Sequence, residues 1–283
     1  MQSSCRAVRH AGHSLGLVPT MGALHAGHLS LIRASKASCE VTAASIFVNP
    51  TQFGPKEDLQ KYPRTFEADC ALLEAESVDL LFAPSVEEMY PQGASTWVEV
   101  EGEGDRLEGA SRPGHLRGVA TVVSKLFHIV APTHAFFGQK DAAQLAVLRK
   151  MVRDLNFDLE IVGCPIVREP DGLAMSSRNA YLSIEERQQA LVLSRALRAA
   201  SDLVARGETS STPLLSAMRQ VFAAEPAARN DYITVVDPDS LLPVKDIAHG
   251  AMLAVAAYIG ATRLLDNVLT QDIIRPKQGR KEP

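Results

Sequence analysis

The stretch that most constrains this chain is residues 18–33, VPTMGALHAGHLSLIR. The apolar run at residues 15–18 predicts a buried strand, the Pro-Thr-Met-Gly segment predicts a tight turn, and the spaced leucines that follow predict a helix. A strand, turn and helix in this order form the place where an open α/β sheet presents backbone N–H groups to a phosphate. Gly22 and Gly27 remove side chains where a nucleotide would approach the backbone. We therefore expect an α/β fold with a nucleotide site at this turn.

Further apolar runs alternate with helical patterns over the first part of the chain. Strands are predicted at residues 41–48, 78–82, 134–137 and 159–167, and helices at residues 64–76, 119–130 and 142–154. This alternation predicts a mostly parallel sheet that is covered on both faces. The intervening residues 87–114 lose the pattern, and we interpret them as an excursion carrying a loop over a site, with one strand at residues 97–100.

The composition changes after residue 167. Ser183 and Glu186 form a capping box that opens a long helix ending near Arg206, and Thr212-Pro213 is expected to cap another ending near Ala224. Short strands are predicted at residues 232–236, 252–258 and 263–265. The sequence thus predicts a Rossmann-like domain at residues 1–167 and a smaller α+β domain at residues 168–283. The basic residues of the tail are expected to form a solvated end, and they are Arg275, Lys277, Arg280 and Lys281.

Composition excludes several classes of protein. The formal net charge of −4 gives no sign of a nucleic-acid or membrane-surface partner. The four cysteines lie far apart with no CxxC pair, which is typical of buried thiols in a reduced compartment. The N-terminus has no apolar segment of signal-peptide length, and the most apolar run, residues 251–261, is too short to span a bilayer. We expect a soluble cytoplasmic protein.

His25 and His28 would share one face of the first helical turn. Two histidines at this spacing, taken alone, commonly have no shared function and simply lie on the surface or in the core. A zinc site would need a third ligand, and neither Cys nor His recurs at metal spacing. Two imidazoles at a helix N-terminus can instead donate hydrogen bonds to a phosphorus centre that gains charge. The strand and turn before the pair favour this third interpretation, and no protein-bound metal is predicted.

Two further clusters carry polar groups suited to a nucleotide. Lys140 follows a predicted strand beside Gly138, where an ammonium could neutralise a transferring phosphoryl group, and Gln144 would point into the same crevice. Residues 175–179, MSSRN, offer two hydroxyls and a guanidinium to a triphosphate at the predicted domain joint. Each cluster also has an interpretation without a ligand: Lys140 could be a surface cation, and residues 175–179 could be a polar loop. The loop at residues 175–179 could close over a nucleotide like a lid.

These motifs resemble those of a known family. Residues 21–28 (MGALHAGH) are similar to the HxGH signature of the nucleotidylyltransferase superfamily, and residues 175–178 to its second signature. The combination resembles the pantothenate synthetase (pantoate–β-alanine ligase) family over residues 17–267. The other matching segments are FVNPTQF at residues 47–53, YPRT at 62–65, EGASRPGH at 108–115, FFGQKD at 136–141, DGLAMSSRN at 171–179 and RLLDN at 263–267.

The resemblance implies a two-step ligation with ATP and Mg²⁺ in which pantoate is adenylated and β-alanine then displaces AMP. It implies a homodimer formed through the first domain, with small-molecule substrates. His25, His28 and Lys140 would be catalytic, with His28 the proton donor, and Gln52 and Gln144 would bind pantoate, Gln52 also lying near β-alanine. The residues assigned to ATP are Met21, Gly22, Ala23, Leu24, His25, Ala26, Gly27, His28, Gly138, Gln139, Lys140, Asp141, Val167, Met175, Ser176, Ser177 and Arg178.

Several points remain open at this stage. Asn49, Tyr62 and Arg112 fit either a structural or a binding role, and either glutamine alone could be a loop-capping amide. Gln139 and Ala142-Ala143 stand where many family members have Glu and an aromatic-Gln pair, so the pocket rim could differ. Sixteen residues precede Leu17, fewer than is usual, which puts an N-terminal edge element in doubt. The alternatives are a plain nucleotidylyltransferase and a catalytically silent nucleotide-binding regulator.

Overall fold

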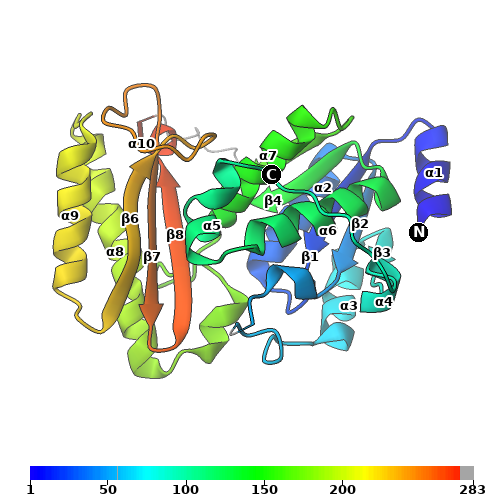
Figure 1. Ribbon diagram of the computed structural model, residues 1–283, viewed down its shortest axis with the longest axis horizontal. Coiled ribbons are helices and arrows are strands. Elements are labelled where there is room, and N and C mark those ends of the chain that lie inside the picture. The colour runs from blue at the N-terminus through cyan, green and yellow to red at the C-terminus, as the bar shows by residue number, and fades with distance from the viewer. Residues whose placement is uncertain (56, 275–283) are drawn as a thin grey trace. The chain divides into compact units, whose positions relative to one another are not determined.

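The computed structural model describes residues 1–55 and 57–274 of the 283-residue chain (Figure 1). It separates into two compact units, the first spanning Met1–Val167 and the second beginning at Arg168. The basic residues of the tail (Arg275, Lys277, Arg280 and Lys281) lie outside the described residues.

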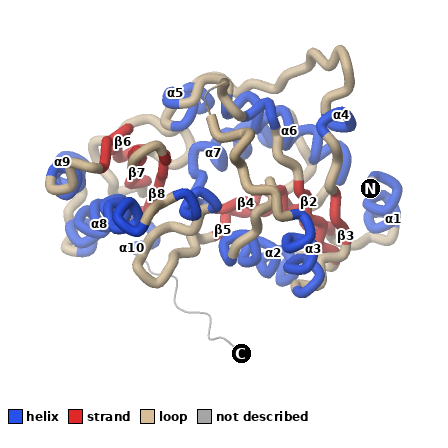
Figure 2. The backbone as a smooth tube through the Cα atoms, turned by 90° about the horizontal axis from the view of Figure 1, so that it is seen from below, coloured by secondary structure: helices blue, strands red, loops and turns tan. Residues whose placement is uncertain are grey.

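A five-stranded sheet in the order β3-β2-β1-β4-β5 forms the centre of the first unit. Every neighbouring pair is parallel, so the predicted parallel sheet is confirmed. Figure 2 shows α2 (Ala26–Ser38) and α3 (Phe66–Ala75) on one face of this sheet and α6 (His115–Val130) and α7 (Ala142–Asp154) on the other. The strands are β1 (Leu15–Thr20), β2 (Val41–Ile46), β3 (Leu80–Phe82), β4 (His134–Gly138) and β5 (Glu160–Cys164).

The strand order reverses between β1 and β4, which are neighbours although β2 and β3 come between them in the chain. The connection after β1 runs toward one edge of the sheet, and the connection after β4 runs toward the other. Open α/β sheets bind ligands outside the carboxyl ends of the strands at such a switch point. The loops after β1 and β4 carry two of the three predicted phosphate-binding clusters, so the topology places these two at this edge.

Four helices of the first unit, α2, α3, α6 and α7, match predicted helical segments with shifts at their ends, whereas the other helices and the short 3₁₀ turns were not predicted. The helices are α1 (Gln2–His10), α2 (Ala26–Ser38), α3 (Phe66–Ala75), α4 (Val86–Met89), α5 (Glu108–Ser111), α6 (His115–Val130) and α7 (Ala142–Asp154). The 3₁₀ turns are η1 (Pro50–Gln52), η2 (Glu103–Asp105) and η3 (Gln139–Asp141).

Two expectations for the first unit are wrong. Residues 97–100 form no strand: the Val98 N–H donates to Thr121 Oγ1 at 3.0 Å on α6, and the half-exposed Trp97 ring lies under the Arg117 guanidinium at 4.8 Å. Side-chain contacts with a helix thus replace a strand ladder for these aromatic and β-branched residues. The short N-terminal segment does contain an edge element, because α1 forms there and buries Cys5.

The second unit consists of a three-stranded antiparallel sheet in the order β6-β7-β8 with helices packed against it (Figure 1). Leucines of α8 and α9 pack with the buried β7 in one apolar core. The elements are η4 (Ser177–Tyr181), α8 (Ile184–Ala205), α9 (Ser211–Ala223), β6 (Ala228–Val236), β7 (Met252–Ile259), β8 (Thr262–Leu269) and α10 (Thr270–Ile274).

Of the two helix caps predicted for the second unit, that of α8 is confirmed and that of α9 is wrong. The predicted capping box is present, since Ser183 accepts the Glu186 N–H and the Glu186 carboxylate accepts the Ser183 N–H. The cap of α9 is Ser210 and not Thr212, because the Ser210 hydroxyl accepts the Thr212 N–H at 3.4 Å. Pro213 then lies within the first turn, where a missing N–H leaves no helical bond unmade.

The cysteine and membrane expectations can be compared with the described residues. Cys5, Cys39 and Cys164 are buried and Cys70 is half-buried, and all four are free thiols. Among the helices that the structure describes, none combines the length and apolar character needed to cross a bilayer.

Gly118 generates the first testable prediction, because α6 packs there directly on the loop after β2. A Cβ added to Gly118 would lie 2.4 Å from the Thr51 carbonyl oxygen and 2.8 Å from Gln52 Cα. Gly118→Ala should therefore lower the free energy of unfolding by at least about 1 kcal/mol, despite the better helix propensity of alanine. Urea unfolding measures this change.

Gly104→Ala is the control for this substitution, because nothing lies within 4 Å of the Cβ that it would add. Its free energy of unfolding should stay within about 0.5 kcal/mol of the wild type. Equal stability of the Gly118→Ala and Gly104→Ala variants would contradict the packing described here.

Candidate active site

His25 and His28 cap the start of α2 through hydrogen bonds from nearby backbone N–H groups to their rings. His25 is the N-cap residue, and its Nδ1 accepts the Gly27 N–H at 3.1 Å. His28 Nδ1 accepts the His25 N–H at 3.4 Å, and the two ring centroids lie 4.1 Å apart. A ring whose Nδ1 accepts a hydrogen bond carries its proton on Nε2. The geometry therefore assigns both imidazoles as neutral Nε2–H donors.

The electrostatic surroundings of His28 keep its ring neutral. Burial, followed by the neighbouring His25 ring, lowers the pKa of His28 to about 3, with the Lys140 ammonium acting in the same direction and the Asp141 carboxylate opposing both. His28 thus interacts with charges on the loop after β4. The structure brings the predicted histidines and the predicted lysine to one region at the carboxyl ends of β1 and β4.

Lys140 and Asp141 lie in η3, at the end of β4 and the start of α7. Lys140 Nζ is 3.3 Å from Asp141 Oδ1. The lysine side chain is only 20% exposed, whereas that of Asp141 is 51% exposed. An ammonium that is largely shielded from water interacts more strongly with an anion than a surface lysine would.

The turn between β1 and α2 uses its backbone N–H groups within the protein. Ala23 donates to Asp69 Oδ2 at 2.9 Å and Leu24 donates to Asp69 Oδ1 at 2.8 Å. The Gly22 N–H donates to Thr20 Oγ1 at 3.2 Å. The expectation that this stretch offers a cradle of backbone donors is therefore wrong for these three N–H groups, because the fold itself occupies them.

Gln52, one of the two predicted pantoate ligands, is 8% exposed and lies in η1 at the end of β2. Its Nε2 donates to Met21 Sδ at 3.1 Å, and its Oε1 accepts from Asn49 Nδ2 at 3.0 Å. The structure thus joins Gln52 to Met21 of the predicted ATP segment. Gln144, the second predicted ligand, is half-buried in the first turn of α7.

Sequence reasoning missed His115 and left Arg112 undecided, yet both hold the backbone of Gln52. Arg112 donates to both carboxylate oxygens of Glu57, at 2.7 and 2.6 Å, and its Nη1 donates to His115 Nε2 at 2.9 Å. His115 Nδ1–H then donates to the Gln52 carbonyl oxygen at 2.8 Å. Burial and the Arg112 charge lower the pKa of His115 to about 4. The Arg-Pro-Gly-His segment at residues 112–115 was the available signal.

Asn49 and Tyr62, also left undecided, have structural contacts. Asn49 is 1% exposed, and its amide donates to the Gly118 carbonyl oxygen at 3.2 Å as well as to Gln52. The Tyr62 ring is buried with its centroid 5.9 Å from that of Phe53. Asn49 therefore fixes the loop that carries Gln52.

In the second unit, a hydrogen bond joins the two residues that flank the loop at residues 175–178. The loop consists of Met175, Ser176, Ser177 and Arg178. Asn179 Nδ2 donates to the Ala174 carbonyl oxygen at 3.1 Å, directly before the loop, and to Glu169 Oε1 at 2.8 Å. Ser176 caps η4 by accepting the Arg178 N–H at 3.3 Å.

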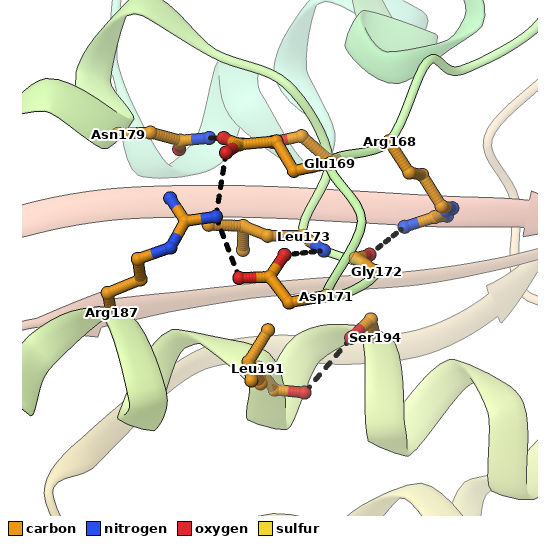
Figure 3. Close-up of polar contacts among 10 residues, drawn as sticks. Arg168, Glu169, Asp171, Gly172, Leu173, Asn179, Arg187, Leu191 and Ser194 are labelled. Carbon is orange, nitrogen blue, oxygen red and sulfur yellow. Dashed lines mark hydrogen bonds and ion pairs between the residues drawn. The ribbon is translucent and has the colours of Figure 1, made fainter.

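Ion pairs stabilise the hairpin that runs from Arg168 to Ala174 and precedes this loop (Figure 3). Arg187 of α8 donates from one nitrogen to Glu169 and to Asp171, at 2.7 Å each. Arg168 donates to both carboxylate oxygens of Asp266 on β8, at 2.6 and 2.9 Å, and to a carbonyl of the hairpin. Asp266 is 3% exposed, so the carboxylate of this pair is shielded from solvent, whereas the Arg168 side chain is 31% exposed. Val167 is half-buried at the end of the first unit.

Comparison with known proteins identifies relatives over nearly the whole chain. A family model described as pantoate-beta-alanine ligase matches residues 1–269. The pantothenate synthetase of Acidobacterium capsulatum is 69% identical over 256 residues, which cover 90% of this chain and 86% of that protein. That of Koribacter versatilis is 59% identical, covering 96% of this chain and 93% of that protein.

Solved structures agree with this assignment. The crystal structure of pantothenate synthetase from Thermus thermophilus superposes with a TM-score of 0.89 at 50% identity, covering 94% of this chain and 97% of that one. A pantoate-beta-alanine ligase from Francisella tularensis, complexed with beta-gamma ATP and beta-alanine, gives a TM-score of 0.75 at 33% identity, covering 95% of each chain.

The low pKa values of His28 and His115 predict the acid stability of the fold. In the unfolded chain a histidine binds a proton below about pH 6.5, whereas these two remain neutral in the folded state until about pH 3 and 4. Within that window the unfolded chain binds more protons, so the free energy of unfolding falls as the pH falls. Each histidine contributes up to about 1.4 kcal/mol per pH unit.

Replacing His115 tests this account by urea unfolding between pH 7 and pH 4.5. His115→Gln should make the fall in unfolding free energy toward acid shallower, while His10→Gln on the exposed face of α1 serves as the control. A slope in the His115→Gln variant identical to that of the wild type would show that His115 is not held neutral.

Proposed function

This chain belongs to the pantoate–β-alanine ligase family, and from that premise we propose how its residues bind and activate the substrates. The chain is an enzyme that condenses pantoate with β-alanine to form pantothenate, and it uses ATP to do so. The family model and the relatives support neither of the two alternatives, a plain nucleotidylyltransferase and a catalytically silent nucleotide-binding regulator. The residue roles below are our proposal.

The phosphates of ATP bind beside His25, His28 and Lys140 in this proposal. Support comes from the shared edge of the sheet, from the interaction of His28 with the Lys140 charge, and from the hydrogen bond to His28 Nδ1, which places the proton of that ring on Nε2. Since the N–H groups of Ala23 and Leu24 donate to Asp69, side chains supply the main contacts at this turn. Gly138, Gln139 and Asp141 complete the ribose and phosphate site.

Magnesium enters this proposal as a partner of the ATP phosphates. Among the residues that the structure describes, no group of three or more His, Cys, Asp or Glu side chains could hold a metal ion. In nucleotide-dependent enzymes Mg²⁺ is usually coordinated by the phosphate oxygens of the nucleotide, and we propose the same coordination here.

The amides of Gln52 and Gln144 bind pantoate. An amide both donates and accepts hydrogen bonds, which matches the hydroxyl and carboxylate groups of a hydroxy acid. Asn49 donates to the side-chain oxygen of Gln52, and Arg112 and His115 both donate to its backbone carbonyl oxygen, so its amide is positioned before the substrate arrives. Val167 is proposed to meet adenine through its backbone, and Met175, Ser176, Ser177 and Arg178 to close on the triphosphate.

The first chemical step is attack by a pantoate carboxylate oxygen on the α-phosphorus of ATP. A P–O bond to pantoate forms, the bond to pyrophosphate breaks, and negative charge increases on the phosphoryl oxygens. Donors that are already in position stabilise this charge most effectively. Because the pKa of His28 is about 3, the ring acts at neutral pH as an uncharged hydrogen-bond donor. Lys140 supplies the positive charge.

The second step joins β-alanine to the activated acyl carbon. The uncharged amine attacks that carbon, a C–N bond forms, AMP departs with the electron pair of the broken C–O bond, and the nitrogen loses a proton. Gln52 lies at the pantoate end of the proposed site and is positioned to contact β-alanine as well.

We also propose that the protein is cytoplasmic and that it forms a homodimer through its first unit. Light scattering of the purified protein tests the dimeric state.

Substitution of His28 and Lys140 tests the proposed adenylation site. His28→Ala and Lys140→Ala should each lower pantoate-dependent exchange of labelled pyrophosphate into ATP by tenfold or more, because each removes a group that stabilises the transition state. The exchange is measured without β-alanine, so that only the first step is observed.

Cys70→Ser is the control, because it alters a half-buried thiol on α3 that belongs to neither loop. It should keep the wild-type exchange rate within about twofold. Near-normal exchange in both the His28→Ala and Lys140→Ala variants would refute the assignment, and absence of pantoate-dependent exchange in the wild type would refute the proposed adenylation.

A further inference from the structure

Asp69 is a buried carboxylate that the proposed reaction does not use. It lies in the first turn of α3 and is 1% exposed. Its two oxygens accept the N–H groups of Ala23 and Leu24, and Oδ2 also accepts from Thr65 Oγ1 at 3.2 Å. α3 covers the same face of the sheet as α2 (Figure 2). A side chain 45 residues along the chain thus holds the two residues directly before His25.

The environment of this carboxylate differs from that of an ordinary buried ion pair. Within residues 1–55 and 57–274, Asp69 has no lysine, arginine or histidine partner. Burial of a carboxylate is costly unless hydrogen bonds satisfy it. Here two backbone N–H groups, one hydroxyl and the N-terminus of α3 supply that satisfaction. The hydrogen-bonding capacity of Asp69 is therefore directed mainly at the turn.

The turn itself has a backbone that needs such support. Gly22 has φ +79° and Ala23 has φ +51°, and a residue with a side chain pays a conformational penalty in this region. A Cβ added to Gly22 would lie 2.9 Å from Asp69 Oδ2 and 3.2 Å from Ile46 Cγ2. The left-handed turn and the carboxylate therefore fit each other closely. Only Leu24 separates Ala23 from the histidine that caps α2.

We propose that Asp69 is a positioning residue for adenylation, since it fixes the path of the turn that delivers His25 and His28 to the reacting phosphate. The inference rests on the proposed role of these histidines. The carboxylate touches no substrate: it acts through the Ala23 and Leu24 N–H groups. Displacement of a catalytic donor by about 1 Å can cost a hundredfold in rate, so a small shift of this turn is sufficient to impair the first step.

The test compares Asp69→Asn with Asp79→Asn in pantoate-dependent pyrophosphate exchange. The asparagine presents an amide NH₂ to one of the two N–H groups, which removes one acceptor at nearly constant shape. We expect kcat for exchange to fall about tenfold to a hundredfold, with KM for pantoate within about twofold of the wild type. Asp79→Asn is the control, because Asp79 Oδ2 also accepts a backbone N–H, that of Thr42 at 2.8 Å, but Asp79 is exposed and lies away from the turn; its kcat should stay within about twofold.

Urea unfolding of each variant separates positioning from plain stabilisation. A merely structural role for Asp69 would lower the unfolding midpoint while folded Asp69→Asn kept the kcat of the wild type, and that result would overturn the proposal. If Asp69→Asn fails to fold, Asp69→Glu takes its place, since it keeps both oxygens and moves them by one methylene. A three- to tenfold fall in kcat with unchanged pantoate KM is then expected, and wild-type kcat in folded Asp69→Glu would overturn the proposal.

The same assay distinguishes failure of this inference from failure of the proposed function. Inactive His28→Ala together with fully active Asp69→Asn would reject Asp69 as a positioning residue and keep the histidine assignment. Active His28→Ala would reject the histidine assignment and, with it, the basis of the proposal for Asp69.

Discussion

The structure of this site depends on a pair of hydrogen bonds in which two histidines cap one helix. His25 accepts the Gly27 N–H of the first turn of α2 through Nδ1, and His28 accepts the N–H of the N-cap residue His25 through Nδ1. This arrangement satisfies N–H groups that a helix start otherwise leaves unpaired, and it fixes which ring nitrogen carries the proton. A structural requirement of the helix and a chemical requirement of phosphoryl transfer are met by the same two side chains.

The surrounding fold brings other groups to these rings. The switch in strand order between β1 and β4 places the His25–His28 turn and the Lys140 loop at one edge of the sheet. Next to them, Arg112 and His115 donate hydrogen bonds to the backbone carbonyl oxygen of Gln52, and Asn49 donates one to its side-chain oxygen. Most of these contacts come from rigid strand ends and helix starts, which suits a site that must hold its donors in place before the charge develops.

Local sequence patterns were sufficient for the alternating strands and helices and for the capping box at Ser183, because element type and helix starts follow from short-range signals. The expected grouping of His25, His28 and Lys140 followed from the rule that the carboxyl ends of parallel strands meet at one edge of a sheet. Contacts between distant residues were not predictable in this way. Asp69 was unmarked because it bonds a turn far away in the chain, and His115 because its partner is a backbone carbonyl. Trp97 suggested a strand, although the ring packs under Arg117. Ser210 rather than Thr212 caps α9, a choice that depends on where the first turn closes.

The central claim is that His28 works as a neutral Nε2–H donor whose Nδ1 accepts the His25 N–H. Long-range ¹⁵N–¹H correlation NMR of the histidine ring nitrogens, recorded at pH 7 with His28→Gln to assign the signals, tests it most directly. The account predicts one protonated and one bare nitrogen in the His28 ring, with the bare nitrogen at Nδ1, and no change in that pattern down to about pH 5. An imidazolium at pH 7, or a neutral ring with its proton on Nδ1, would contradict the account.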